Sequence, residues 1–181
     1  MILLMGIAGS GKGTQGKMLA DQHGLHLISM GDVLRMYVTG KQRQRMLAGG
    51  LLEDQEIIAI VDKLFESISN GTEILIDGFP RTIAQAEWLL NQAKAGRFKV
   101  DLALHLVASR RAVKERLLKR ARIDDTEAAI EARFDQYEQS TEPLIDWLSR
   151  HNVKVVNIDA EQTVETVNQQ LVKALKDYKK A

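Results

Sequence analysis

The sequence predicts an α/β fold in which a five-stranded parallel sheet is flanked by helices. Short apolar runs alternate along the chain with longer segments of helical period, which is the pattern of repeated strand–helix units. Several of these runs are apolar on both faces, as is typical of parallel strands covered by helices on each side. Because strands and helices alternate, we expect right-handed crossovers between parallel neighbours.

Five apolar runs are the candidate strands. They are short and are separated by segments long enough to hold a crossover helix. We expect strands over Ile2–Met5, Leu25–Ser29, Glu73–Ile76, Leu102–Val107 and Val153–Ile158.

The first two helices have clear signals at their ends. One is expected over 12–22, after the first strand, and Gly24 ends it. A second is expected over 55–69, where apolar side chains recur on one stripe until Asn70-Gly71. Both ends use residues that tolerate the left-handed conformation of a helix C-terminus.

Later helices are also marked by their first residues. The segment 164–177 has an apolar stripe, and Thr163 is its expected N-cap. Another helix is expected to start near Asp124-Asp125, since acidic residues favour a helix N-terminus. Pro143 suits the first turn of the helix that follows it.

Length and composition indicate one globular domain and exclude several classes of protein. The chain has 181 residues, a net charge of +1 and no cysteine. The balanced charge does not favour nucleic acid or an anionic membrane as a partner. The lack of cysteine excludes disulfides and Cys-ligated zinc. The first apolar run, Met1–Met5, is too short for a signal peptide or a membrane span, so we expect a cytoplasmic protein. We also expect a monomer, with an oligomer as the alternative.

Residues 6–14, GIAGSGKGT, form the strongest chemical motif. They follow a predicted strand and open a predicted helix, the context that a phosphate-binding loop requires. Glycines let backbone N–H groups converge on one anion, and Lys12 supplies a mobile charge for the β- and γ-phosphates. Gly13 stands where the usual pattern has Ser or Thr, and the hydroxyl comes at Thr14. The motif favours a three-layer sandwich of the P-loop NTPase type over an ordinary glycine-rich turn.

A second motif, ILIDGFPR, ends a buried strand with a carboxylate. Asp77 is costly at that position unless it has a partner or a function. In P-loop proteins, an Asp at a strand end near the loop commonly holds Mg²⁺, often through water. Capping of a turn is the alternative role. Arg81 follows at the carboxyl edge of the sheet, where α/β folds bind their ligands.

Basic residues are concentrated between residues 110 and 122. Seven of these thirteen residues are Lys or Arg, and one is acidic. Since a phosphate loop implies a polyanion nearby, we expect contacts with phosphate or base from Arg116, Arg120 and Arg122. We expect an ordinary solvated helix surface from Arg110, Arg111 and Lys114. The histidines lie singly on different predicted elements, and we expect structural or solvated roles for His23, His26, His105 and His151.

The motifs occur together in the order found in one enzyme family. After the phosphate loop come SMGDVLR at 29–35, IDGFPRT at 76–82, RLLKR at 116–120 and RIDD at 122–125. This ordered set covers essentially the whole chain and resembles the adenylate kinases, which are nucleoside-monophosphate kinases. The resemblance implies reversible, Mg²⁺-dependent phosphoryl transfer from ATP to AMP, giving two ADP.

The resemblance also implies a role for individual residues. The positions matched to ATP binding are Gly9, Ser10, Gly11, Lys12, Gly13, Thr14, Arg116, Arg120 and Ala160. The positions matched to AMP binding are Met30, Gly31, Arg35, Glu53, Gly78, Arg81, Gln85, Arg122 and Arg133. The positions matched to catalysis are Lys12, Arg81, Arg120, Arg122 and Arg133. Asp77 matches a carboxylate that reaches Mg²⁺ through water, and Asp124 and Asp125 match a pair that orients the lid arginines.

Two departures from the family pattern concern the acceptor base. Met30 replaces a Thr that is usual when the acceptor is AMP, and Glu53 replaces an apolar residue whose backbone meets the base. Gln85 favours AMP, because relatives that prefer UMP or CMP usually carry Asn there. We therefore expect AMP as the acceptor. A UMP/CMP kinase, and a nucleotide-binding module without turnover, are the alternatives.

The third departure is an unusually short lid. One residue, Ala121, separates Arg120 from Arg122. We expect a single kinase domain with a core over 1–29, 60–119 and 134–181, an acceptor-binding region over 30–59 and a minimal lid over about 120–126. Since a lid normally excludes water from the transfer site, we expect closure mainly by the acceptor-binding region and weaker shielding of the phosphates.

Overall fold

The computed structural model describes residues 1–69, 71–100 and 102–180, and it contains the predicted parallel sheet. All strand pairs are parallel, in the order β2-β3-β1-β4-β5. The strands are β1 (Ile2–Met5), β2 (His26–Ser29), β3 (Ile74–Asp77), β4 (Leu102–Val107) and β5 (Lys154–Asp159). Each one begins and ends within one residue of its expected bounds, so the strand predictions are confirmed.

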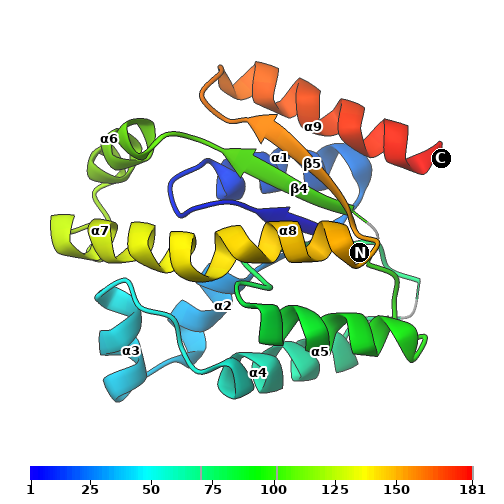
Figure 1. The fold of residues 1–181 in the computed structure, drawn as a ribbon, viewed down its shortest axis with the longest axis horizontal. Coiled ribbons are helices and arrows are strands. Elements are labelled where there is room, and N and C mark those ends of the chain that lie inside the picture. Colours follow the sequence, from blue (N-terminus) through cyan, green and yellow to red (C-terminus); the bar gives the residue numbers. More distant parts are fainter. Residues whose placement is uncertain (70, 101, 181) are drawn as a thin grey trace.

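Helices connect the strands and cover both faces of the sheet (Figure 1). They are α1 (Lys12–His23), α2 (Met30–Tyr37), α3 (Gly40–Leu47), α4 (Asp54–Glu66), α5 (Ile83–Lys94), α6 (Arg110–Arg120), α7 (Glu127–Gln136), α8 (Glu142–Arg150) and α9 (Val164–Lys179). A π-helical turn, η1 (Tyr137–Thr141), joins α7 to α8. In the part of the chain that the structure describes, no helix combines the length and apolarity needed to cross a bilayer.

Alternate residues of the central strand supply two separate cores, which makes the fold a three-layer sandwich. Leu4 packs in a cluster with Leu19 of α1 and Leu171 of α9. Its neighbour Leu3 packs on the opposite face, in a cluster that includes Leu89 of α5 and residues of α4 and α8. The strand residues are therefore buried on both sides, as the continuous apolar runs predict.

The strand order places a ligand crevice at the carboxyl end of β1. β1 lies between β3 and β4, so the chain crosses from one side of β1 to the other after β3. In parallel α/β sheets, such a reversal opens a crevice beyond the carboxyl ends of the strands. The loop after β1 and Asp77 at the end of β3 both lie at this edge.

Most predicted helix ends agree with the structure, and one start is wrong. Thr163 caps α9 by accepting a hydrogen bond from the backbone N–H of Thr166. The helix expected near Asp124-Asp125 starts instead at Glu127, with Thr126 as its N-cap. The reason is that arginine side chains engage Asp125, whereas the Thr126 hydroxyl is available to accept a hydrogen bond from the backbone N–H of Ala129.

One further helix end differs from expectation, and one predicted first turn is confirmed. The helix expected over 55–69 occupies Asp54–Glu66, and Asn70 of its expected stop lies outside the described residues. Pro143 does lie in the first turn of α8, but α7, η1 and α8 follow one another without a break.

Candidate active site

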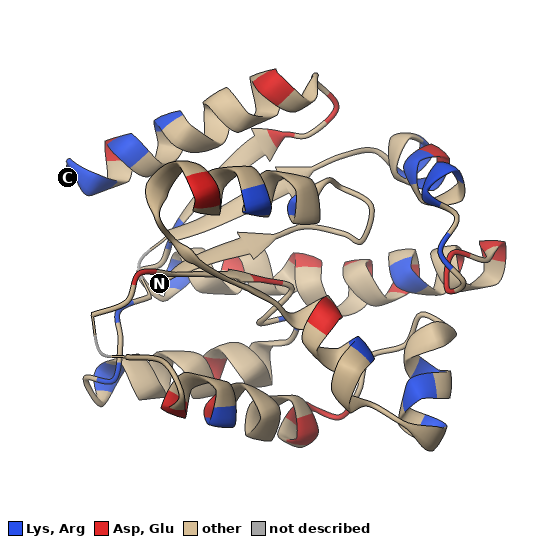
Figure 2. Cartoon of the chain, turned by 180° about the vertical axis from the view of Figure 1, so that it is seen from behind, with Lys and Arg blue, Asp and Glu red and all other residues tan. Residues whose placement is uncertain are grey.

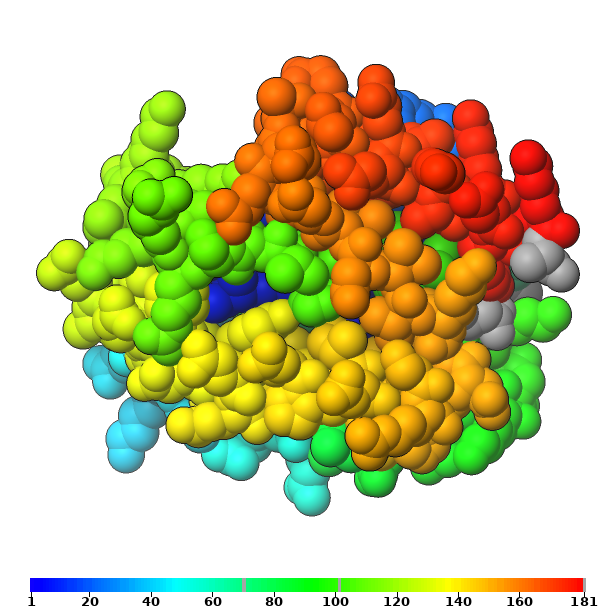
Figure 3. Space-filling model, turned by 45° about the horizontal axis from the view of Figure 1, so that its top comes forward, coloured from blue at the N-terminus to red at the C-terminus, as the bar shows by residue number. Residues whose placement is uncertain are grey.

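A cavity of about 840 Å³ lies at the carboxyl edge of the sheet. Its walls come from the loop after β1, from α2, from the turn after β3, from the α6–α7 segment and from the loop after β5. In Figure 3, dark blue atoms from the start of the chain form the floor of a hollow bordered by green, yellow and orange atoms. Most of the predicted site residues line this cavity. Glu53 and Asp125 lie outside its lining.

The loop after β1 is shaped to receive an anion. Gly11 is the N-cap of α1 with φ 101°, a left-handed conformation that glycine adopts without strain. A glycine N-cap has no side chain to occupy the first N–H groups of the helix, so these groups stay available to a phosphate. Gly9 is also left-handed, and a side chain there would meet Leu117 at 2.8 Å.

Lys12 lies deep in this loop. Its Nζ donates hydrogen bonds to the carbonyl oxygens of Gly6 (2.7 Å) and Ile7 (2.9 Å). Burial lowers the pKa of Lys12 from 10.5 to about 8; the Asp77 carboxylate raises it again, and the nearby Arg81 and Arg120 lower it. An anion in the loop would therefore stabilise the charged form of this amine.

Arginines from distant parts of the chain share the cavity with Lys12. Burial lowers the pKa of Arg81; Asp77 opposes this, and the positive charges of Arg133 and Arg35 add to it. The pKa of Arg122 is likewise lowered by burial and then by Arg120 and Arg35. Lys and Arg are also frequent on α6 and α3, at the same end of the molecule (Figure 2). The cavity thus gathers cations that repel one another until a polyanion neutralises them.

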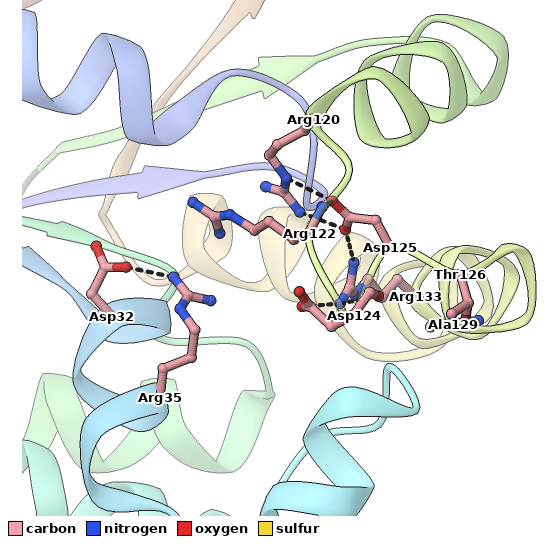
Figure 4. A network of polar contacts seen from close by, with 9 residues as sticks. All are labelled: Asp32, Arg35, Arg120, Arg122, Asp124, Asp125, Thr126, Ala129 and Arg133. Carbon is pink, nitrogen blue, oxygen red and sulfur yellow. Dashed lines mark hydrogen bonds and ion pairs between the residues drawn. The ribbon is translucent and has the colours of Figure 1, made fainter.

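The lid arginines are held by two carboxylates. Arg120 donates to Asp125 through Nε (2.8 Å) and Nη2 (2.7 Å). Arg133 donates to the same carboxylate (2.9 Å) and to Asp124 Oδ2 (2.5 Å). Figure 4 shows this network on one side of the site, with Arg122 and Arg35 extending into the space between the lid and α2. The two carboxylates expected to orient the lid are therefore in direct contact with its arginines.

The Asp125 side chain is fully buried beneath these arginines. Burial by itself raises the pKa of this carboxyl, but the hydrogen bonds from Arg120 and Arg133 outweigh it and lower the pKa to about 2. The lid residue Ala121 adopts a left-handed conformation with φ 52°, which turns the chain sharply after α6. The segment expected to form the minimal lid is thus held by ion pairs.

The two ends of the cavity contain the residues expected to meet the bases. Arg116 donates through Nη2 to the carbonyl oxygen of Ala160 (2.8 Å), which brings α6 beside the loop after β5. At the other end, Met30 and Gln85 are buried and line the cavity. The Glu53 side chain instead pairs with Arg45 (2.5 Å) outside the lining, so its carboxylate faces away from this end.

Asp77 is suited to a magnesium ion that is held mainly by phosphates. It ends β3 and lines the cavity close enough to Lys12 to shift its pKa. Over residues 1–69, 71–100 and 102–180, three or more metal-binding side chains do not gather in one place. Mg²⁺ commonly takes one or two carboxylates, substrate phosphates and water. A single carboxylate beside a phosphate loop fits that coordination.

Some residues of the site were not predicted from the sequence. Asp54 accepts hydrogen bonds from Thr82 and Gln85. Tyr137 lines the cavity and contacts His105 (2.6 Å), which agrees with a structural role for that histidine. Both sets of contacts join residues far apart in sequence, and no local motif signals them.

Comparisons with known proteins agree with this site. A family model described as adenylate kinase matches residues 4–153. The chain is 37% identical over 180 residues to an adenylate kinase of Corynebacterium urealyticum, covering 96% of this chain and 98% of that protein. It is 35% identical to one of Synechococcus sp., covering 96% and 97%. It is 33% identical to one of Porphyromonas gingivalis, covering 99% and 97%.

These matches extend over nearly the full length of the relatives, and they include the phosphate loop and the arginine motifs around the cavity. Composition and fold class alone would fit many unrelated functions. The agreement of family model, relatives and site geometry is specific. The chain belongs to the adenylate kinase family and is a nucleoside-monophosphate kinase, a phosphotransferase.

Proposed function

We propose that the protein transfers the terminal phosphoryl group of ATP to AMP, reversibly, at this cavity. One observation carries the proposal: a glycine-rich anion-binding loop and cations from three other segments of the chain open into one cavity. The cations of these segments are Arg35, Arg81, Arg120, Arg122 and Arg133, and Lys12 of the loop itself joins them. A single site of this kind can hold two phosphate chains end to end.

The two nucleotides would occupy opposite ends of the cavity. The ATP phosphates would lie in the loop of residues 9–14, and Arg116 would stack on the ATP base beside Ala160. The AMP phosphate would be held by Arg35 and Arg81. The AMP base would meet Gln85, while Met30, Gly31 and Gly78 would line the path between phosphate and base.

The residues present are sufficient for this reaction without a general base. The attacking group is a phosphate oxygen of AMP, which is already an anion, so no proton has to be removed. Lys12 and Arg81 would stabilise the charge of the transferred group, and Arg120, Arg122 and Arg133 would close over it. Asp77 would hold Mg²⁺ through water, and the ion would supply charge neutralisation for the substrate phosphates.

The chain would form one domain, in which the core, the acceptor-binding region and the lid have different functions. The core, 1–29, 60–119 and 134–181, holds the sheet and the ATP loop. The acceptor-binding region, 30–59, carries Arg35. The lid, about 120–126, is held by Asp124 and Asp125 and would move little, so closure would come from the acceptor-binding region.

An acceptor panel tests the proposal. ADP formation is measured by a coupled assay with ATP and each of AMP, UMP, CMP and GMP. We expect AMP to have the highest kcat/KM. Lys12→Met and Arg81→Ala should each lower kcat by about 10² or more with AMP. A preference for a pyrimidine monophosphate, or a rate within a few-fold of wild type for Lys12→Met, would contradict the assignment.

A further inference from the structure

The amide of Gln85 is held from two sides. Its side chain is 2% exposed and lies against the cavity. Oε1 accepts a hydrogen bond from the backbone N–H of Arg81 (2.8 Å), and Nε2 donates one to Asp54 Oδ1 (2.8 Å). Thr82 Oγ1 donates to the same Asp54 oxygen (2.9 Å), so the carboxylate is itself fixed.

These two partners permit one orientation of the amide. A backbone N–H can donate but not accept, and an ionised carboxylate can accept but not donate. If the Gln85 amide turned over by 180°, Nε2 would face the N–H of Arg81 and Oε1 would face Asp54. Two donors would then face each other at Arg81 and two acceptors at Asp54, and both hydrogen bonds would be lost. Thr141 Oγ1 also donates to the carbonyl oxygen of Arg81 (3.1 Å), which ties the backbone of this residue to η1.

Once these bonds are made, the amide keeps one N–H and one lone pair for a ligand. Adenine presents an amino donor at its 6-position and an acceptor at N1. A 6-oxopurine, as in GMP or IMP, presents the inverse: an acceptor at the 6-position and an N–H at N1. For a base held in one place, one orientation of the amide pairs with the first pattern, and the opposite orientation pairs with the second.

We propose that Asp54 is a positioning residue that locks the Gln85 amide and thereby selects a 6-aminopurine monophosphate against a 6-oxopurine. The inference rests on the proposed function, since it assigns the Gln85 end of the cavity to the acceptor base. Asp54 lies at the start of α4, behind the amide and outside the cavity lining, so it acts through Gln85. Its partners Thr82 and Gln85 belong to the start of α5.

The test compares equilibrium affinities for AMP and IMP, which differ at the 6-position but have the same ring size. In wild type we expect AMP to bind more tightly by a large factor, because IMP would leave buried polar groups unpaired. Asp54→Asn keeps the size of the side chain but can donate as well as accept. Because the backbone N–H of Arg81 still opposes the turned amide, the Kd ratio of IMP to AMP should fall by the worth of one hydrogen bond, about tenfold, through tighter binding of IMP.

Control variants distinguish orientation of the Gln85 amide by Asp54 from a purely structural role of Asp54. Asp54→Glu keeps an accept-only carboxylate and should keep the wild-type ratio. Asp62→Asn makes the same chemical change on α4 at the ion pair with Arg97, outside the cavity lining, and should leave both affinities unchanged. If Asp54→Asn is unstable, Asp54→Ser applies the same test, since a hydroxyl both donates and accepts.

The outcomes are distinct. An unchanged Kd ratio in folded Asp54→Asn or Asp54→Ser overturns the proposed role of Asp54, even if the enzyme phosphorylates AMP. A fall in the ratio supports it, even if turnover is absent and the proposed reaction fails. A wild-type protein that binds neither AMP nor IMP overturns both.

Discussion

Arg120 donates two hydrogen bonds to the buried carboxylate of Asp125, through Nε at 2.8 Å and Nη2 at 2.7 Å. The pair is bidentate, a geometry that fixes the guanidinium plane as well as its position. The same carboxylate accepts a bond from Arg133 and one from the backbone N–H of Arg122 (3.2 Å). One side chain therefore positions three arginines that the proposed reaction needs.

We predict that Asp125→Asn lowers both stability and turnover. Removing one partner of a buried ion pair should destabilise the fold by about 3 kcal/mol, because Arg120 loses its counter-charge and Arg133 keeps only Asp124. The kcat with AMP should fall by about 10² as the guanidinium groups lose their orientation. Chemical denaturation and steady-state kinetics measure the two effects. Asp135→Asn, which removes an exposed ion pair with Arg110, is the matched control and should cost less than about 1 kcal/mol.

The low pKa of Asp125 also predicts a pH dependence. The folded carboxyl titrates at about 2 instead of the ordinary 3.8, so the unfolded chain binds its proton first as the pH falls. Its contribution to stability is complete above pH 4 and is lost between pH 4 and pH 2. Denaturation of wild type and Asp125→Asn across this interval should give curves that converge at low pH. Parallel curves would show that Asp125 is not responsible.

We predict that the buried Lys12 amine, which the reaction needs, lowers the stability of the folded state without ligand. Its folded pKa of about 8 lies below the ordinary 10.5, so the charged form is disfavoured in the folded state at neutral pH. Lys12→Met should therefore unfold at a higher temperature than wild type without ligand, although it loses turnover. ATP should raise the unfolding temperature of wild type much more than that of the variant. A variant that melts below wild type would show that the hydrogen bonds to Gly6 and Ile7 outweigh the cost of burying the charge.

The same group predicts how ATP affinity changes with pH. Above pH 8 the amine of the free enzyme becomes neutral, and ATP has to bind together with a proton. The Kd for ATP should rise by up to about tenfold per pH unit between pH 8 and pH 10. Titration calorimetry in buffers of different ionisation enthalpy would detect the proton uptake. Lys12→Met should bind ATP weakly and without this dependence.

Asp77→Asn should change the magnesium dependence of the reaction. The amide keeps an oxygen ligand but removes the charge that attracts the hydrated ion. The Mg²⁺ concentration for half-maximal rate should rise about tenfold at saturating ATP and AMP, with a smaller change in the AMP affinity. An unchanged magnesium profile would instead indicate a capping role for Asp77.

The short lid predicts that phosphoryl groups are transferred from ATP to water when no acceptor is bound. One residue separates Arg120 from Arg122, and Figure 3 shows atoms from the start of the chain, in dark blue, on the floor of an open hollow. Since water exclusion depends on closure over the transfer site, ATP hydrolysis without acceptor should be faster than in a long-lid adenylate kinase. Phosphate release under matched conditions measures this. A rate no higher than that of the long-lid enzyme would contradict the prediction.

The sequence by itself determined the fold class, the strand positions and the phosphate loop. These features depend on neighbours in the chain: strands on continuous apolar runs, and the loop on glycines between a strand and a helix. Helices α2, α3 and α5 were not predicted from local sequence patterns. In α3, none of the residues is buried, so its sequence has no apolar face to reveal it.

Tertiary structure decided what those local motifs do together. It brought Lys12, Arg35, Arg81 and Arg122 into one cavity, and it moved the start of α7 from Asp125 to Glu127 because arginines engage that carboxylate. It also joined Asp54 to Gln85 across 31 positions of the chain. Hydrogen bonds and charge interactions depend on distance in space, and that distance is set by the packing of whole helices against the sheet.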